Sequence, residues 1–213
     1  MRIQLNKVIP VPLKDISNHI STCWNAMVDI PSNQRIVVQA VSGKGKSTFV
    51  NSIYGIRYDF EGEILLDNQS TKEMSMDEWA TMRATKMSVV FQDLQLIPHL
   101  TVEENLALKN DLTNHKTIEE QKQLVKRVEL LDKWNVACGL LSYGQQQRIA
   151  IVRAMLQPFE VILLDEPFAH LDHDNSQICY KLIDEEAKKN AATVVLTTLN
   201  NTTIDSFDQL LIL

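Results

Sequence analysis

The chain has 213 residues and a formal net charge of −6, with 45% hydrophobic and 23% charged residues. This composition is typical of a folded protein with one substantial domain or two small lobes, and it argues against intrinsic disorder. The negative charge argues against a broad nucleic-acid-binding surface, so we expect no nucleic-acid partner.

The cysteines and the apolar segments argue against two further classes of protein. Cys23, Cys138 and Cys179 are odd in number, far apart and not in CxxC spacing, which argues against a disulfide scaffold or a zinc site. We expect reduced, buried thiols, as in a cytosolic protein. The N-terminus lacks the apolar run of a signal peptide, and no apolar stretch is long enough to span a bilayer. If the protein works at a membrane, we expect another chain to supply the membrane-spanning part.

Strands and helices alternate in the first part of the chain. The apolar run 36–40 predicts a buried strand that ends in a glycine-bearing turn. Phe49, Val50 and Ile53 follow at helical spacing, with Gly55 as a plausible stop. Further strands are predicted at 62–68 and 87–91.

The middle of the chain predicts a helical lobe inserted between strands. Thr117 and Glu120 have the spacing of a capping box, and Leu124, Val128 and Leu131 mark one face of the helix that follows. A second helix is predicted after Gly144, closed by Pro158. We place this lobe at about 93–158, and a core lobe at about 1–92 and 159–213, within a single domain.

Strands return in the last part of the chain. The segments 161–164 and 193–197 are short and apolar, a helix is predicted at 176–189 between them, and 209–213 suggests a terminal strand. Strands that alternate with helices indicate an α/β fold with a mainly parallel sheet.

The glycine-bearing turn between the first strand and its helix predicts a phosphate-binding loop. Backbone N–H groups of such a turn line a concave nest, and the helix N-terminus adds a positive partial charge. Gly43 and Gly45 allow backbone torsions that other residues resist. Lys46 would reach the β- and γ-phosphates, and the Ser47 hydroxyl would bind Mg²⁺. The alternative is a chance glycine turn, but the flanking strand and helix are the context that the motif requires.

Two carboxylates follow the strand at 161–164. Asp165 can hold Mg²⁺ directly or through water, and Glu166 points differently and can face an attacking water. Any buried strand can end in Asp-Glu, so the pair alone does not indicate a nucleotide site. It indicates one when the same chain also has a phosphate-binding loop. Together they predict Mg-ATP as the ligand and attack of water on the γ-phosphate as the reaction.

With Leu141-Ser142-Tyr143-Gly144-Gln145 added, the chain resembles the nucleotide-binding subunits of ATP-binding cassette transporters, whose signature is Leu-Ser-Gly-Gly-Gln. The segments 90–93 (the Gln loop), 146–154 and 169–172 (the Asp loop) resemble the family too, so the likeness covers almost the whole chain. It implies a P-loop NTPase core with a mainly parallel sheet, an antiparallel N-terminal β portion and the inserted helical lobe.

The resemblance also implies a mechanism and a set of site residues. Two cassettes would close head to tail over two ATP molecules, so that Ser142 and Gly144 of one subunit contact the γ-phosphate held by Lys46 of the other. The implied nucleotide-binding residues are Ala40, Val41, Ser42, Gly43, Lys44, Gly45, Lys46, Ser47, Thr48, Ser142, Gly144 and Gln145. The implied catalytic residues are Glu166, Lys46, Gln92 and Thr198, and the implied metal ligands are Ser47, Gln92 and Asp165.

The segment 94–105 and Arg83 resemble the branch of the family that serves lipoprotein release, macrolide export and cell-division complexes. In that branch a groove beside this segment receives a short helix from the membrane subunit. The alternative is a loop that only packs its own lobe. The resemblance implies an integral membrane permease as partner, a homodimer as the simpler pairing, and a cytoplasmic protein on the inner face of the cell membrane.

Three nucleotide-facing positions depart from the family pattern. Ala40 stands in place of the first Gly of the phosphate loop, Tyr143 in place of the first Gly of the signature, and Thr198 in place of a His. A threonine hydroxyl can bind a phosphate but cannot carry positive charge, so we expect slow hydrolysis. Tyr143 could be a tolerated exposed substitution or could loosen closure. The family's adenine-stacking aromatic also has no counterpart, because the corresponding stretch holds Val11 or Pro12.

These departures leave alternative functions open. The first is an ATPase subunit that powers a transporter or extracts lipoproteins. The second is a regulatory module in which ATP closes the dimer and signals to a membrane partner with little turnover. A soluble role in DNA repair or translation is the third, but the chain has neither the long coiled-coil insertion of the repair relatives nor a second cassette. His170 and His173 flank Asp172, and we expect them to be solvated rather than metal-bound.

Overall fold

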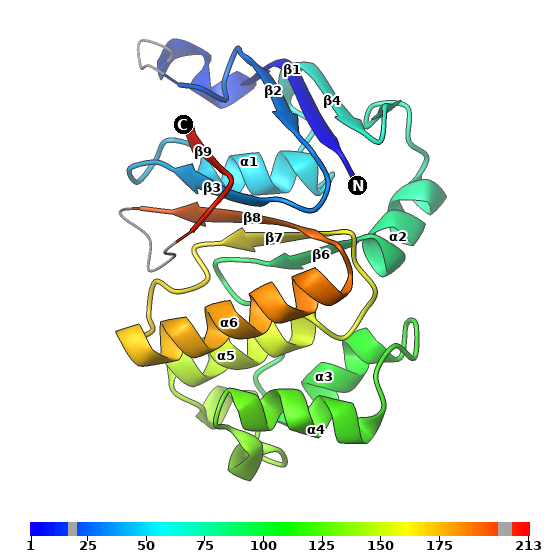
Figure 1. The fold of residues 1–213 in the computed structure, drawn as a ribbon, viewed down its shortest axis with the longest axis vertical. Coiled ribbons are helices and arrows are strands. Elements are labelled where there is room, and N and C mark those ends of the chain that lie inside the picture. Colours follow the sequence, from blue (N-terminus) through cyan, green and yellow to red (C-terminus); the bar gives the residue numbers. More distant parts are fainter. Residues whose placement is uncertain (17–20, 200–205) are drawn as a thin grey trace.

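Two β-sheets enclose helix α1 (Lys46–Ile53), and the remaining long helices lie on the other face of the larger sheet or beside it (Figure 1). The computed structural model describes residues 1–16, 21–199 and 206–213. Nowhere in these ranges is a helix both long enough and apolar enough to cross a membrane.

The larger sheet has five parallel strands in the order β6-β7-β8-β3-β9. They are β3 (Arg35–Gln39), β6 (Met87–Val90), β7 (Val161–Asp165), β8 (Thr193–Thr198) and β9 (Gln209–Ile212). All five residues of β7 are buried, as expected where helices cover both faces of a parallel sheet. The register places Gln39 beside Thr198, and Asp165 beside Thr197. The carboxyl ends of β3, β7 and β8 therefore meet at one edge.

The smaller sheet is antiparallel, in the order β2-β1-β4-β5. Its strands are β1 (Ile3–Pro10), β2 (Met27–Ile30), β4 (Phe60–Leu66) and β5 (Gln69–Ser70), and a 3-10 turn, η1 (Val11–Ile16), follows β1. Apolar side chains of this sheet share one buried cluster with α1, through Ile3 and Leu5 on β1 and Phe49 and Ile53 on the helix. This packing fixes α1 between the two sheets.

Helices α5 (Tyr143–Ala154) and α6 (His173–Lys189) cover the other face of the parallel sheet. Beyond α5 lie α3 (Val102–Asn110) and α4 (Ile118–Arg127), while α2 (Met76–Thr85) packs near β6 at the side (Figure 1). Short 3-10 turns, η2 (Leu131–Lys133) and η3 (Cys138–Leu140), connect α4 to α5. A second buried cluster joins these helices to the sheet.

The predicted fold class is confirmed, with corrections at the element ends. The capping box of Thr117 and Glu120 is present at α4, but Leu131 lies outside the helix, in η2, and is 39% exposed. Helix α5 begins at Tyr143, before Gly144, because Ser142 is its N-cap. Helix α6 begins at His173 because Asp172 caps it. All three cysteines are free and buried, as expected.

Candidate nucleotide-binding site

The predicted phosphate-binding loop connects the end of β3 to the start of α1. Gly43 and Gly45 have φ of 78° and 99°, in the left-handed region that glycine adopts at no steric cost. Gly45 is the N-cap of α1, and no side chain caps this helix end. The N–H groups at the start of α1 therefore stay available to an anion.

Two side chains that the sequence analysis did not assign lie against this loop. A Cβ built on Gly45 would stand 2.7 Å from Leu13 Cδ1 and 3.3 Å from Trp24 Cζ2. The indole N–H of Trp24 donates to the Lys44 carbonyl at 3.4 Å, and its ring packs edge-to-face on Phe49. A side chain at Gly45 would require Leu13 and Trp24 to shift, and the φ of 99° would strain any residue with a Cβ. The sequence analysis matched the family's adenine-stacking aromatic to Val11 or Pro12, and Val11 is 51% exposed. Trp24, the tryptophan that precedes the loop, is the signal in the sequence that could have indicated an aromatic side chain here.

The Lys46 ammonium is held inside the loop by three oxygen atoms. It donates to the carbonyls of Ala40 at 3.0 Å and Val41 at 3.2 Å, and it lies 3.3 Å from Glu166 Oε1. Lys46 is 5% exposed. A buried cation with only carbonyl and carboxylate partners is suited to bind a phosphate that displaces one of them.

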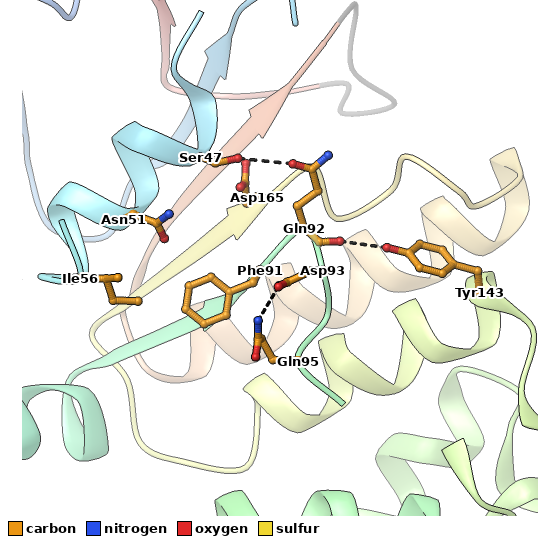
Figure 2. Close-up of a pocket in the computed structure, with 9 residues that line it drawn as sticks. All are labelled: Ser47, Asn51, Ile56, Phe91, Gln92, Asp93, Gln95, Tyr143 and Asp165. Carbon is orange, nitrogen blue, oxygen red and sulfur yellow. Dashed lines mark hydrogen bonds between the residues drawn. The ribbon is translucent and has the colours of Figure 1, made fainter. Parts of the chain in front are cut away.

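The three predicted metal ligands line one cavity of about 800 Å³ (Figure 2). They come from different elements: Ser47 from α1, Gln92 from the loop after β6, and Asp165 from the end of β7. The Ser47 hydroxyl donates to Gln92 Oε1 at 3.4 Å, so two of the three oxygen donors already meet. A hydroxyl, an amide oxygen and a carboxylate form the hard oxygen set that Mg²⁺ prefers.

These residues fit a magnesium ion that arrives with a nucleotide. The described part of the chain has no group of three or more His, Cys, Asp or Glu side chains that could hold a metal ion. Mg²⁺ characteristically takes one or two protein oxygens and completes its shell with phosphates and water. The site therefore fits Mg²⁺ as part of Mg-ATP.

Thr197 holds the Asp165 carboxylate and the backbone of Glu166, and the sequence analysis did not single it out. Its hydroxyl donates to Asp165 Oδ1 at 2.7 Å and accepts the backbone N–H of Glu166 at 3.2 Å. Thr197 is fully buried and Asp165 is 3% exposed. The pairing of Asp165 with Thr197 across β7 and β8 places this hydroxyl, and a single sequence does not reveal strand register.

The backbone of Glu166 is strained. Its φ of 49° lies in the left-handed region, which costs a residue with a Cβ on the order of 1–3 kcal/mol. Besides the Thr197 contact, the Glu166 carbonyl accepts the side-chain amide of Gln147 at 3.2 Å. These contacts hold the turn that directs the Glu166 carboxylate to Lys46.

Thr198, which stands in place of the family His, lies beside the phosphate-binding loop. Its carbonyl accepts the backbone N–H of Ala40 at 3.2 Å, and the residue is half-buried at the end of β8. The backbone of Thr198 is thus adjacent to the phosphate-binding loop.

The signature residues form the start of α5. Ser142 and Gln145 make a reciprocal capping box. A Cβ on Gly144 would stand 3.1 Å from the carbonyl oxygen of His170, so the helix start packs closely on the loop after β7. Ser142 and Gln145 thus bond to each other, while Gly144 packs on the loop after β7. The structure therefore brings the predicted catalytic and metal residues together beside the phosphate-binding loop. It places Ser142, Gly144 and Gln145 at the start of α5.

The loop after Gln92 is fixed from within. Leu94 and Gln95 have positive φ, of 60° and 51°, and their carbonyls both accept the guanidinium of Arg153 at 2.6 Å. Burial lowers the pKa of Arg153 from its ordinary value. Arg153 belongs to α5, so one helix carries both the signature residues and the anchor of the Gln92 loop.

Comparisons with known proteins agree with this geometry. The family described as "ABC transporter" matches residues 24–169. The lipoprotein-releasing system ATP-binding protein LolD of Buchnera aphidicola subsp. Schizaphis graminum is 37% identical over 148 residues, which are 68% of this chain and 64% of LolD. The thiamine import ATP-binding protein ThiQ of Haemophilus influenzae (strain ATCC 51907 / DSM 11121 / KW20 / Rd) is 34% identical over 217 residues, covering 99% and 94% of the two chains.

Among solved structures, a dimeric structure of the bacterial ABC transporter cassette MJ0796 has a TM-score of 0.79 at 30% identity, covering 93% of this chain and 88% of that one. The relative of the same name comes from Methanocaldococcus jannaschii. The share of a relative's length that this chain spans ranges from 28%, for a macrolide export ATP-binding/permease protein, to 94%. The chain belongs to the ABC transporter family and carries its ATP-binding cassette, whose members bind Mg-ATP and hydrolyse it.

Proposed function

We propose that this chain is the ATP-hydrolysing subunit of an ABC transporter and works as a head-to-tail pair. The observation that carries the proposal is the meeting of Lys46, Glu166, Ser47, Gln92 and Asp165 at one edge of the parallel sheet. These residues supply a cation for phosphate, oxygen donors for Mg²⁺ and a carboxylate for water, which are the parts that phosphoryl transfer to water requires.

Each residue then has a role set by its contacts. Ser47, Gln92 and Asp165 would hold Mg²⁺, which neutralises phosphate charge when bound with ATP. Lys46 exchanges its Glu166 partner for a phosphate oxygen while it keeps the carbonyls of Ala40 and Val41. Glu166, released from Lys46, accepts a proton from the attacking water.

The second copy would supply the signature residues. Ser142 caps a helix of twelve residues, and backbone N–H groups at such a helix start bind anions. Ser142 and Gln145 bond to each other and Gly144 packs on the loop after β7, and we assign all three residues to the γ-phosphate bound by the paired subunit. A dimeric structure has been solved for the cassette MJ0796. The pair proposed here is a homodimer.

We further propose an integral membrane permease as partner and a position on the inner face of the cell membrane. Ser47, Gln92 and Asp165 line one part of the cavity in Figure 2. Ile56, which is 53% exposed, and Phe91, Asp93 and Gln95 line the part away from Ser47 and Asp165. This outer part combines apolar and polar side chains and suits an amphipathic segment of another protein. The relative named for lipoprotein release, LolD, and the relative named for thiamine import, ThiQ, are 37% and 34% identical to this chain. Sequence identity therefore does not indicate which cargo the transporter carries. The segment 94–105 and Arg83 favour the release or export branch.

The domain division is proposed with this function. Residues at about 93–158 form the helical lobe and the rest the core lobe, so that Gln92 lies at the junction. A movement of Gln92 on binding Mg²⁺ would then be transmitted to the helical lobe through the loop after Gln92, whose carbonyls accept hydrogen bonds from Arg153.

Turnover of Mg-ATP by the purified chain tests the proposal. We expect measurable hydrolysis by the wild type and a loss of roughly 10²-fold or more in Glu166→Gln, because a general base contributes that much. The absence of Mg²⁺-dependent ATP binding would contradict the proposal. Equal, slow turnover of both proteins would instead favour the regulatory module, which Thr198 in place of the family His makes the second candidate.

A further inference from the structure

Tyr143 is an exposed residue whose side chain turns back onto its own chain. It is the first residue of α5, between Ser142 and Gly144, and is 44% exposed. Its phenol hydroxyl donates to the backbone carbonyl of Gln92 at 3.0 Å (Figure 2). Its ring meets that of His170 edge-to-face, with centroids 4.5 Å apart and planes at 81°. A glycine at this position, as in the family signature, could make neither contact.

The Gln92 end of this bridge leads to the predicted metal ligands. The Gln92 side chain accepts the Ser47 hydroxyl at 3.4 Å, while its carbonyl accepts Tyr143. One residue therefore connects the phosphate-binding helix to the start of α5 through two hydrogen bonds. A shift of Gln92 when it binds Mg²⁺ would act directly on the tyrosine hydroxyl.

The His170 end leads to the predicted general base. The His170 backbone N–H donates to Gln147 Oε1 at 3.3 Å, and the Gln147 amide donates to the Glu166 carbonyl at 3.2 Å. The carbonyl of His170 limits the space at Gly144. Tyr143 is thus in contact with the Gln92 loop and with the loop that carries Glu166. It also lies between Ser142 and Gly144, two of the three residues assigned to the phosphate of the paired subunit.

We propose that Tyr143 is a positioning residue that couples the state of Gln92 to the orientation of Ser142 and Gly144. The inference rests on the proposed function, because it gives that orientation its role in closing the pair. Tyr143 touches none of the reacting groups. It makes the start of α5 respond to Mg-nucleotide in its own subunit before that helix meets the nucleotide of the other.

Hydrogen exchange of backbone amides in the full chain tests the coupling, with and without Mg-ATP. The wild type is compared with Tyr143→Phe, which keeps the ring and removes the hydroxyl. The matched control is Tyr180→Phe, which removes a hydroxyl that also donates to a backbone carbonyl, that of Ser206, at 3.4 Å. Tyr180 lies in α6 in a pocket with Arg35 and Asp208, at the opposite end of the parallel strands.

We expect Mg-ATP to slow exchange at both 92–95 and 142–147 in the wild type and in Tyr180→Phe. In Tyr143→Phe the change at 92–95 should remain and the change at 142–147 should be lost or fall by roughly two- to tenfold, the range of one neutral hydrogen bond. The kcat for ATP should fall by a similar factor while the Kd for Mg-ATP stays the same. Equal slowing at 142–147 in Tyr143→Phe and wild type would overturn the coupling.

The two proposals fail differently. If the wild type binds no Mg-ATP, the proposed function fails, and the coupling is judged from the nucleotide-free proteins. There Tyr143→Phe must still exchange faster than Tyr180→Phe at 142–147 by about two- to tenfold, and equal rates overturn the bridge. His170→Ala, which removes the ring contact and keeps the hydroxyl, should give a smaller effect in the same direction, and an effect in the opposite direction contradicts the bridge.

Discussion

Glu166 and Lys46 form an ion pair in which Oε1 and Nζ are 3.3 Å apart and the side chains are 11% and 5% exposed. The pair joins the predicted general base to the predicted phosphate-binding cation. An ATP γ-phosphate and the Glu166 carboxylate are both anions, and both are directed at the same ammonium group. Glu166 therefore acts as an internal competitor of the phosphate until it turns toward water.

This competition predicts that Glu166→Gln binds Mg-ATP more tightly than the wild type does. Removing the carboxylate relieves the repulsion between two anions in a site of low exposure, and like charges placed together cost several kcal/mol at an interface. We expect the Kd to fall by at least about tenfold. Equilibrium binding of a fluorescent ATP analogue to both proteins measures it.

Glu166→Asp provides the control for this binding experiment, because it keeps the charge and shortens the side chain. Its Kd should stay within a few-fold of the wild-type value. Weaker binding by Glu166→Gln than by the wild type would mean that the carboxylate supports the site, and would refute the competition.

Thr197→Val should destabilise the protein and weaken its response to Mg²⁺. The substitution leaves Asp165 Oδ1 without its 2.7 Å partner in a fully buried place, which costs about 1–3 kcal/mol. For a chain of this size each kcal/mol lowers the Tm by roughly 2–4 °C. Thermal unfolding followed by circular dichroism gives the shift.

Thr193→Val is the matched control for that experiment, since Thr193 is also buried on β8 and its hydroxyl donates to the Pro31 carbonyl at 3.2 Å. We expect both variants to lose stability, but only Thr197→Val to lose Mg²⁺-dependent ATP affinity. If the ATP affinity of Thr197→Val depends on Mg²⁺ as it does in the wild type, Thr197 does not support the metal site.

Much of the fold could be predicted because apolar strands and motif residues alternate in one order. The run 161–164 and the glycines at 43 and 45 indicate strand and turn from local physics alone. Helix α3 was missed although Thr101 and Glu104 form the same capping box that revealed α4. The apolar residues of α3 form no clear helical stripe, so its capping box lacks the periodic pattern that follows the capping box of α4.

The parts of the site that escaped prediction depend on contacts between distant segments. Trp24 precedes Gly45 by twenty-one residues and covers it only because β1 and β2 pack over α1. The Glu166–Lys46 pair joins residues 120 positions apart. The bridge from Tyr143 to Gln92 likewise requires the packing of α5 beside β6. A single sequence specifies which residues carry chemistry, but such contacts follow from tertiary packing.

The cysteines should resist alkylation in the folded protein at pH 8. Burial raises the pKa of Cys23 and Cys179 from 9.0 to about 12, so the thiolate fraction falls by about a thousandfold. Burial also raises the pKa of Cys138. Labelling with iodoacetamide followed by mass spectrometry should show no modification in the folded protein and three modified thiols in urea, and rapid labelling of the folded protein would contradict the buried placement.

The same shifts contribute to a loss of stability at alkaline pH. A thiol whose pKa is raised by folding contributes fully to stability below the unfolded value of 9.0, and that contribution is lost as the pH rises toward 12. The free energy of unfolding should therefore decline between pH 9 and 12. Cys23→Ala should lessen the decline, and an equal slope in the variant and the wild type would contradict the assignment.

Thr198→His should raise the turnover of ATP. Thr198 ends β8 beside Ala40, so an imidazole there could donate a hydrogen bond to the γ-phosphate and, when protonated, supply positive charge that a hydroxyl lacks. One preorganised donor of this kind contributes roughly 10²–10³ in kcat, and we expect a gain of about tenfold or more, measured as phosphate release. Thr198→Gln, which adds a neutral donor, should gain less. If neither variant exceeds the wild type while both bind Mg-ATP normally, the slow step lies elsewhere, and the argument for Thr198 as the cause of slow hydrolysis fails.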